Sequence, residues 1–301
     1  MVNAMELRDI EYFAVVAEHG NVTRASEALG LSPPALSKSL RRLEKAMHAR
    51  LVTRTPKGVE LTVVGSALLA QVRRIRLTLA DVEREAADLS QGRAGHVRIG
   101  ASAARAEELS ASFAALLKEA PNATLSITVS DNDVMIPALR RGELDLIFNY
   151  LTKSPYEGCI KENLYDDEQI VYASANHPLA KQKVVTMADL ARERWTLSPV
   201  NGLPWHTLYR AFQDRGLPPP RVAVETRSIR LRLQTVASTN LLGFISSRII
   251  REAAQRFRLK ALSVKGVRWR RPVGVMYRDD GYLSPAAKRF IEILKSTART
   301  R

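Results

Sequence analysis

Residues 32–47 have the sequence SPPALSKSLRRLEKAM, and this segment decides how the first part of the chain folds. Four apolar side chains in it repeat at the spacing of one helix face: Leu36, Leu40, Leu43 and Met47. Three cations repeat on the other side: Lys38, Arg41 and Lys45. Ser32 is a favourable N-cap, and Pro33 suits the first helical position because its missing N–H needs no partner there. The segment therefore predicts an amphipathic helix with a basic outer face.

A shorter helix is predicted just before this one, at residues 23–29. Its inward side would be formed by small and aliphatic residues: Val22, Ala25, Ala28 and Leu29. Gly30 then introduces a tight turn. Two helices joined in this way, the second with a basic face, form the pattern of a helix-turn-helix, whose second helix lies in the DNA major groove. An ordinary helical hairpin with a solvated basic face is the alternative at this point.

The segment after the second helix predicts a β-hairpin. Residues 51–54 and 59–62 have the composition of short strands around the turn sequence TPKG. Arg54 and Lys57 near its tip suit phosphate contact. Residues 33–57 contain seven Lys or Arg and one acid, a local balance of +6. A wing beside a basic helix favours a DNA-binding surface.

The run ASEALGLSPPALSKSLRRLE at residues 25–44, followed by LVTRTPKGVELTVVG at 51–65, resembles the winged helix-turn-helix of LysR-type transcriptional regulators. Pro33 is a departure, because the family usually has Gln there, so a base-contacting amide is missing. The resemblance implies double-stranded DNA and RNA polymerase as partners. The candidate DNA contacts are Thr23, Ser32, Pro34, Ala35, Ser37, Lys38, Arg41, Arg42, Arg54 and Lys57.

Length and composition limit the class of protein. A chain of 301 residues suggests two or three domains with substantial cores. Its single cysteine, Cys159, excludes a disulfide framework and a cysteine-based zinc cluster. Acidic residues near the N-terminus do not fit a signal peptide, and no apolar run approaches the roughly 18 residues of a membrane span. We therefore expect a soluble, cytoplasmic protein.

The formal net charge of +15 is unevenly distributed. Residues 1–95 contain 14 basic and 11 acidic residues, residues 96–220 contain 13 and 15, and residues 221–301 contain 19 and 5. The last third therefore carries a balance of +14. A solvated basic surface is the favoured explanation, with an anionic effector or accessory DNA contact as the alternatives.

A first helix at residues 6–19 would complete a winged domain over residues 1–62, and a long helix is predicted at residues 63–89. The long helix carries apolar residues at alternating spacings of four and three: Leu68, Val72, Ile75, Leu79, Val82, Ala86 and Leu89. So narrow a seam favours pairing with a partner helix over packing against its own domain. The family resemblance also implies a dimerisation helix, in a homodimer or a homotetramer. Two copies would place two recognition helices on one pseudo-palindromic operator.

The sequence pattern changes after a predicted hinge at residues 90–95. Strands and helices then alternate, which indicates an α/β fold with parallel units. Predicted strands cover residues 96–101, 124–129, 144–149, 169–173, 195–197, 221–225, 242–245 and 271–277. Predicted helices cover residues 104–120, 133–141, 188–193, 205–215, 229–238, 247–254 and 284–296.

The alternation resembles the two-lobed, periplasmic-binding-protein-type effector domain of the same family. The resemblance implies an effector-binding domain at residues 96–301, with lobe I at about 96–165 and 269–301 and lobe II at about 166–268. The segment ASTNLLGFI at residues 237–245 departs from the glycine-rich version that is common in the family.

Polar residues follow several predicted strands, at the sheet edge where ligands bind in open α/β folds. The candidate effector contacts are Ser102, Ala103, Ser130, Asn149, Ser198, Asn201, Thr226 and Arg227. An ordinary cap or turn role is the alternative for each of them. Arg227 is the sharpest candidate, because a guanidinium can bind a carboxylate with two hydrogen bonds. Its alternative is a surface charge beside Arg230 and Arg232, and the expected effector is a small anion.

Motifs of enzyme chemistry are missing from the sequence. The five histidines lack metal-ligand spacing, and there is neither a GxSxG elbow nor a Walker loop. We therefore expect no enzyme activity, no cofactor and no metal. Two other functions stay open: a small-molecule binding protein or enzyme with an N-terminal oligomerisation module, and a sequence-indifferent DNA-packaging protein. The wing and the two-lobed second half favour a ligand-responsive DNA-binding regulator.

Overall fold

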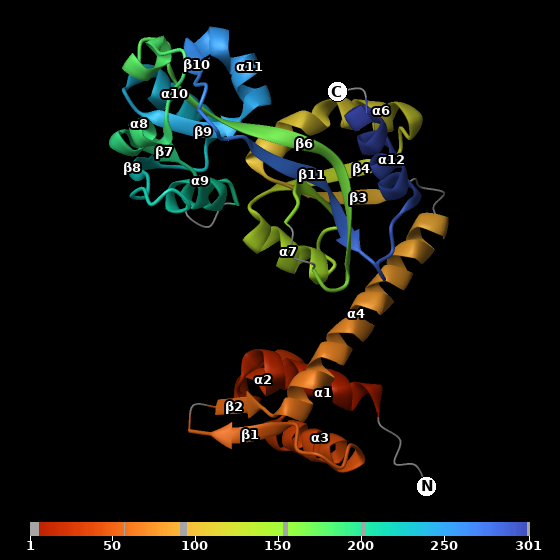
Figure 1. Ribbon diagram of the computed structural model, residues 1–301. Coiled ribbons are helices and arrows are strands. Elements are labelled where there is room, and N and C mark those ends of the chain that lie inside the picture. Colours follow the sequence, from red (N-terminus) through yellow and green to blue (C-terminus); the bar gives the residue numbers. More distant parts are fainter. Residues whose placement is uncertain (1–5, 57, 91–94, 153–155, 200–202, 300–301) are drawn as a thin grey trace. The chain divides into compact units, whose positions relative to one another are not determined.

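A computed structural model describes residues 6–56, 58–90, 95–152, 156–199 and 203–299. The chain forms two compact units, residues 1–84 and residues 85–301 (Figure 1). We call them the N-terminal unit and the effector unit and describe each by itself. Within the described residues, no helix is both long enough and apolar enough to cross a membrane.

The N-terminal unit is a winged helix-turn-helix. In order it contains α1 (Leu7–His19), α2 (Val22–Leu29), α3 (Pro33–Ala46), β1 (Val52–Thr55), β2 (Gly58–Leu61) and the first part of α4 (Val63–Ser90). The predicted helices, turn and hairpin are therefore confirmed, with ends that differ by a few residues. The Ser32 hydroxyl accepts a hydrogen bond from the Ala35 N–H at 3.4 Å, as expected of an N-cap.

The core of this unit lies between α1, α3, β1 and α4. Its buried members are Ile10, Phe13, Ala14, Leu40, Leu43, Leu51, Val52, Leu69 and Val72. The inward side of α2 differs from the prediction, because Ala28 is exposed and Ser26 is buried. At 3.6 residues per turn, position 28 lies roughly 120° around the helix from Val22, whereas Ser26 lies close to it. The Ser26 hydroxyl is satisfied by donating to the Thr23 carbonyl at 2.7 Å.

The wing is fixed to the end of α1 by a close approach of two backbones. Gly20 ends α1 with a φ of 60°, and its carbonyl accepts a hydrogen bond from the Val59 N–H at 2.7 Å. Gly58 has a φ of 132°, and a Cβ there would lie 2.3 Å from the Gly20 oxygen. Only glycine fits at position 58, so the turn of the wing depends on it.

The effector unit is built on one mixed sheet. Its described strands are β3 (His96–Ala101), β4 (Thr124–Val129), β5 (Leu146–Tyr150), β6 (Cys159–Ser174), β7 (Arg194–Leu197), β8 (Arg221–Glu225), β9 (Leu242–Ser246), β10 (Leu259–Ala261) and β11 (Trp269–Arg278). The order is β4-β3-β5-β11-β6-β9-β7-β8, with β10 paired to β6. The pairs β3–β4, β3–β5, β7–β8 and β7–β9 are parallel, as expected.

Two long strands break the expected alternation. β6 has 16 residues, although only residues 169–173 were predicted as a strand, and β11 pairs with it in antiparallel register. β11 is also antiparallel to β5, and β6 to β9 and β10. The first half of β6 is amphipathic and rich in charge, so it lacked the apolar pattern of a buried strand. The short strand β10 was not predicted.

The helices of the effector unit largely follow the prediction. They are α5 (Ala103–Ala106), α6 (Ser110–Glu119), α7 (Asn132–Arg140), α8 (Met187–Arg192), α9 (Leu203–Gln213), α10 (Ile229–Ser238), α11 (Ser247–Phe257) and α12 (Pro285–Arg299). The single helix predicted at residues 104–120 is wrong. A 3₁₀ turn at Glu107–Leu109 separates α5 from α6, and Arg105 in α5 is fully buried there.

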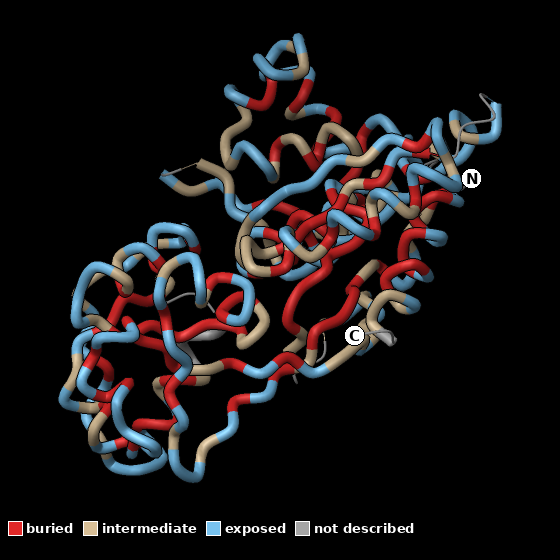
Figure 2. Tube along the Cα trace, turned by 90° about the horizontal axis from the view of Figure 1, so that it is seen from above, coloured by how far each residue is buried: buried red, intermediate tan, exposed pale blue. Residues whose placement is uncertain are grey.

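Separate cores lie toward the two ends of β6 and β11. One core surrounds β3, β5 and α12 and includes Ile99, Phe148 and Phe290. The other end holds two clusters, one with Trp195 and Phe212 and one around α10 and α11. We call the first of these regions lobe I and the second lobe II; β6 and β11 pass from one lobe to the other in Figure 1. Figure 2 shows buried stretches in the interior, with exposed stretches around them.

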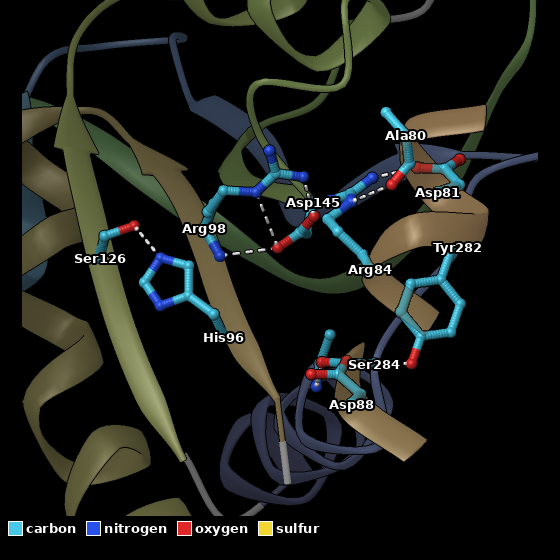
Figure 3. A network of polar contacts seen from close by, with 11 residues as sticks. Ala80, Asp81, Arg84, Asp88, His96, Arg98, Ser126, Asp145, Tyr282 and Ser284 are labelled. Atoms are coloured by element: carbon cyan, nitrogen blue, oxygen red, sulfur yellow. Dashed lines mark hydrogen bonds and ion pairs between the residues drawn. The ribbon is translucent and has the colours of Figure 1, made fainter. Parts of the chain in front are cut away.

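Polar contacts fix the start of the effector unit (Figure 3). Asp145 accepts hydrogen bonds from the Arg98 backbone N–H at 2.8 Å and from its guanidinium at 2.5 Å. The Tyr282 hydroxyl donates to Asp88, in the last turns of α4, at 3.0 Å. Four of the six residues of the predicted hinge, 91–94, lie outside the described residues.

Candidate functional site

The outer face of α3 is exposed and basic. Lys38 and Arg41 are exposed, and neither has an ion-pair partner among the described residues. The other predicted DNA contacts that are exposed are Thr23, Ser32, Pro34, Ala35, Arg42 and Arg54; Ser37 is half-buried. Within the described part of the chain, a phosphate or base would therefore displace no salt bridge on binding Lys38 or Arg41.

Arg54 joins the wing to this face. Its guanidinium donates to the Ser37 hydroxyl at 3.4 Å, so β1 and α3 present their polar groups together. A shallow groove between them is lined in part by Arg41, Arg50 and Arg54. Lys57, the other predicted wing contact, lies outside the described residues.

Arg42, unlike its neighbour Arg41, forms an ion pair with an acid of α1. Its Nε and Nη2 both donate to the carboxylate of Asp9 at 2.5 Å, and the Ser39 hydroxyl donates to the same carboxylate at 2.5 Å. Asp9 is only 2% exposed, and the hydrogen bond from Arg42 lowers the pKa of its carboxyl. Arg42, which we predicted as a DNA contact, thus fastens α3 to α1.

Glu44 has a positioning role that sequence reasoning missed. It is the single acid of the basic segment, and its side chain is buried. Its Oε1 accepts hydrogen bonds from the backbone N–H groups of Leu51 at 2.9 Å and Val52 at 3.5 Å. Glu44 therefore sets the start of the wing relative to α3. Glu44 lies eight residues before the first residue of β1, and an acid at that distance from a strand is not a recognisable sequence signal.

The predicted seam of α4 is an exposed apolar stripe only in its second half. Val72 is 1% exposed and belongs to the core of the N-terminal unit, so its assignment to a dimer seam is wrong. Leu68 is half-buried against the same core. From the next seam position onward the apolar residues are exposed: Ile75, Leu79, Val82, Ala86 and Leu89. The first two positions were misassigned because the winged domain needs α4 to complete its core.

A cavity of about 150 Å³ lies between lobe I and lobe II of the effector unit. Six of the eight predicted effector contacts line it: Ser102, Ala103, Ser130, Asn149, Ser198 and Arg227. Thr226 is not among its lining residues, and its hydroxyl accepts a hydrogen bond from the Ser228 N–H at 3.2 Å, an ordinary turn role. Asn201 lies outside the described residues.

A chain of amide and hydroxyl groups forms the lobe I wall of this cavity. The Ser102 hydroxyl donates to Asn149 Oδ1 at 2.8 Å, and Asn149 Nδ2 donates to Asn132 Oδ1 at 2.6 Å. Asn132 Nδ2 donates in turn to the Tyr150 carbonyl at 3.4 Å. The chain fixes the orientation of each amide, and Asn132, which also follows the second predicted strand, was not among the candidate contacts.

Two arginines of lobe II line the cavity, and they differ in burial and in pairing. The exposed Arg227 is paired with Asp131 of lobe I, with Nε and Oδ2 2.9 Å apart. Arg232 is 7% exposed, and its Nε has no hydrogen-bond partner among the described residues. Burial lowers the pKa of Arg232. The alternative interpretation of Arg227 counted Arg232 as a surface charge, which is wrong for Arg232: it lies three positions after the buried Ile229 and beside the buried Leu233.

A buried polar cluster lies next to the cavity. Asp167 is 1% exposed and accepts hydrogen bonds from Tyr150 at 2.6 Å, Gln169 at 2.9 Å and Ser246 at 2.8 Å. The ring of Tyr150, which also lines the cavity, has the guanidinium carbon of Arg105 4.9 Å and that of Arg271 4.1 Å from its centroid. Burial lowers the pKa of Arg271 to about 10. The cavity thus touches a polar network that spans both lobes.

Fold and site define a winged helix-turn-helix protein with a two-lobed ligand-binding unit. Residues 7–66 match the family "Bacterial regulatory helix-turn-helix protein, lysR family", and residues 90–299 match "LysR substrate binding domain". The second match alone covers more than half of the chain. The protein belongs to the LysR family of transcriptional regulators.

Individual relatives agree with this assignment. The chain is 28% identical to the HTH-type transcriptional regulator GbpR of Azospirillum brasilense, over 99% of this chain and 88% of that protein. It is 29% identical to the RuBisCO operon transcriptional regulator of Allochromatium vinosum, over 98% and 97%. Its fold matches that of full-length CbnR complexed with target DNA, with a TM-score of 0.61 and 22% identity over 97% of this chain and 99% of that chain.

Proposed function

We propose that this regulator binds a pseudo-palindromic promoter site as a homodimer or a dimer of dimers, and that a small anion in the cavity between its lobes changes that binding. Its site of action would be cytoplasmic DNA, with RNA polymerase as a further partner. The observation that carries the DNA part is the exposed face of α3, where Lys38 and Arg41 have no ion-pair partner among the described residues. An internal partner would have to be displaced before these cations could bind DNA.

Selection from a random-sequence duplex library tests the DNA part. The full chain should enrich one symmetric sequence, because two copies of α3 would contact two half-sites about one helical turn apart. The double variant Lys38→Ala/Arg41→Ala should enrich none, while Arg230→Ala, which removes an exposed charge from the effector unit, should select the same sequence as the wild type. A wild-type chain that enriches no sequence would refute sequence-specific binding.

We also propose the exposed part of the α4 seam as the dimer contact. Ile75 and Leu79 are 43% and 51% exposed, one helical turn apart, which leaves an apolar stripe in water. Replacing both by Asp would place unpaired charges in the contact, at a cost of several kcal/mol. Analytical ultracentrifugation should then find monomers. The control Ala80→Asp/Ala87→Asp adds the same charges at exposed positions off the seam and should stay dimeric.

A further inference from the structure

We propose that Arg232 is the anion-binding residue of the cavity between the lobes, and that the ligand it selects is a small monocarboxylate with an apolar body. This inference rests on the proposed function, in which an effector occupies that cavity, and it names the effector's chemical class. The sequence favoured Arg227 as the residue that binds the effector's negative charge. We assign this role to Arg232, five positions further along the chain.

Arg232 is buried, and its Nε has no hydrogen-bond partner among the described residues. A guanidinium has five N–H donors and cannot be deprotonated under ordinary conditions, so it must be matched by an acceptor when it leaves water. The side chain lines the cavity, is 7% exposed, and has a buried Nε without a partner among the described residues. An anion in the cavity would supply the missing acceptor. Arg227, by contrast, is 63% exposed in its side chain and already has Asp131.

The charges of the lining residues indicate a monoanion. Among the described residues that line the cavity, the charged ones are Asp131, Arg227 and Arg232. Asp131 and Arg227 balance each other through their ion pair. One positive charge is left, on Arg232, and a single carboxylate neutralises it. A dianion would leave a net negative charge in a partly desolvated site, next to Asp131.

Size and polarity of the walls define the rest of the ligand. A cavity of about 150 Å³ in an apolar protein interior holds one benzene molecule, so this cavity has room for about one six-membered ring. Several of its lining residues are apolar or aromatic: Ala103, Ala104, Val129, Tyr150 and Ile229. Such walls favour an aliphatic or aromatic body without further charges. Benzoate and short fatty acids have the required chemistry.

The placement of the two walls indicates how such a ligand would act. Arg232 belongs to α10 of lobe II, whereas the Ser102, Asn149 and Asn132 chain belongs to lobe I. A ligand that binds Arg232 and also touches this chain would hold the lobes in one arrangement. Its effect on DNA binding is limited by how much better it binds that arrangement than the other.

Isothermal titration calorimetry on the full chain tests the inference, with sodium butyrate and sodium benzoate as probes and benzamide as the neutral counterpart of benzoate. We expect saturable binding of at least one carboxylate with one site per chain, and no comparable binding of benzamide. Arg232→Gln should weaken carboxylate binding about tenfold to a hundredfold, the usual effect of losing a charge-assisted hydrogen bond. Arg230→Gln on the same helix, an exposed position, is the matched control and should bind like the wild type.

Folding of the variants is followed separately by tryptophan fluorescence in urea. Arg232→Lys keeps the charge but loses the planar fork, so it should bind with intermediate affinity. The inference is overturned if neither carboxylate binds, if benzamide binds as tightly as benzoate, or if a folded Arg232→Gln binds with wild-type affinity. These results are independent of DNA: a chain that selects an operator but binds no carboxylate refutes the inference alone. A chain that binds carboxylate through Arg232 but selects no operator refutes the proposed function.

Discussion

The cations on the outer face of α3 and the wing lie in surroundings opposite to those of two arginines in the effector unit. Lys38, Arg41 and Arg54 are exposed on α3 and β1, with no ion-pair partner among the described residues. In the effector unit, Arg105 and Arg271 are buried and lie beside Tyr150 and Asp167.

The difference separates two roles of a cationic side chain. An exposed cation costs little free energy when unbound and attracts phosphate over a long range, so it suits a ligand as large and charged as DNA. A buried cation is costly unless an acceptor is fixed beside it, as Asp167 and Glu108 are beside Arg105, so it suits a structural role. The two units therefore predict different consequences when a charge or its partner is removed.

The largest effect is expected for Asp167→Ala in the effector unit. Asp167 accepts three hydrogen bonds and lies 3.5 Å from the guanidinium of Arg105, so its loss leaves several buried donors without their acceptor and leaves Arg105 with Glu108 as its ion-pair partner. Breaking a buried pair in this way costs about 3–5 kcal/mol. Urea unfolding followed by tryptophan fluorescence measures it, because Trp195, Trp205 and Trp269 all belong to residues 85–301.

The neighbouring Glu168→Ala is the control for this change. Glu168 lies on the same strand but is exposed, so its removal should change the free energy of unfolding by no more than about 0.5 kcal/mol. Equal effects of the two substitutions would contradict the role given to the buried cluster.

A smaller effect is expected for Asp9→Ala in the N-terminal unit. The change removes the acceptor of Arg42 and of the buried Ser39, at a cost of about 1–3 kcal/mol. Glu6→Ala removes an exposed acid 3.3 Å from the same arginine and should cost less than about 1 kcal/mol. Far-UV circular dichroism, which reports the helices of both units, should show an earlier urea transition for Asp9→Ala, while tryptophan fluorescence, which reports residues 85–301, should stay unchanged in both variants.

The pH dependence of the same contact gives a sharper test. The hydrogen bond from Arg42 lowers the pKa of Asp9 below its ordinary value of 3.8. The ionised carboxylate therefore stabilises the fold above about pH 4, and this contribution disappears as the pH falls through the lowered pKa. The difference in melting temperature between wild type and Asp9→Ala should shrink from pH 7 towards pH 3. A constant difference would mean that Asp9 does not act through its charge.

The helix and the wing that carry the proposed DNA-binding surface could be predicted because their signals are local. The alternation of Leu36, Leu40 and Leu43 with Lys38 and Arg41 specifies a helix face without reference to distant residues. The turn residues of the wing act in the same way. Arg42 shows the limit of this reasoning, because its partner Asp9 lies 33 positions away and only the fold brings them together.

The cavity could be predicted only in outline. Strand ends located Ser102, Ser130, Asn149 and Ser198 correctly, since ligand sites in α/β sheets follow from topology. The choice between Arg227 and Arg232 depended on burial, which is set by how α10 packs on lobe II. Val72 was misassigned for a similar reason, because a heptad pattern cannot tell a partner helix from the helix's own domain.

The central claim is that the exposed face of α3 recognises DNA sequence while the wing contributes charge. It is tested most directly by fluorescence anisotropy with the selected operator and a scrambled duplex, over a range of salt concentrations. Arg41→Ala should lose about 1–3 kcal/mol on the operator and much less on the scrambled duplex. Arg54→Ala should weaken both duplexes similarly and reduce the salt slope by about one. If Arg41→Ala weakens both duplexes equally, or neither, the assignment of α3 as the recognition helix is contradicted.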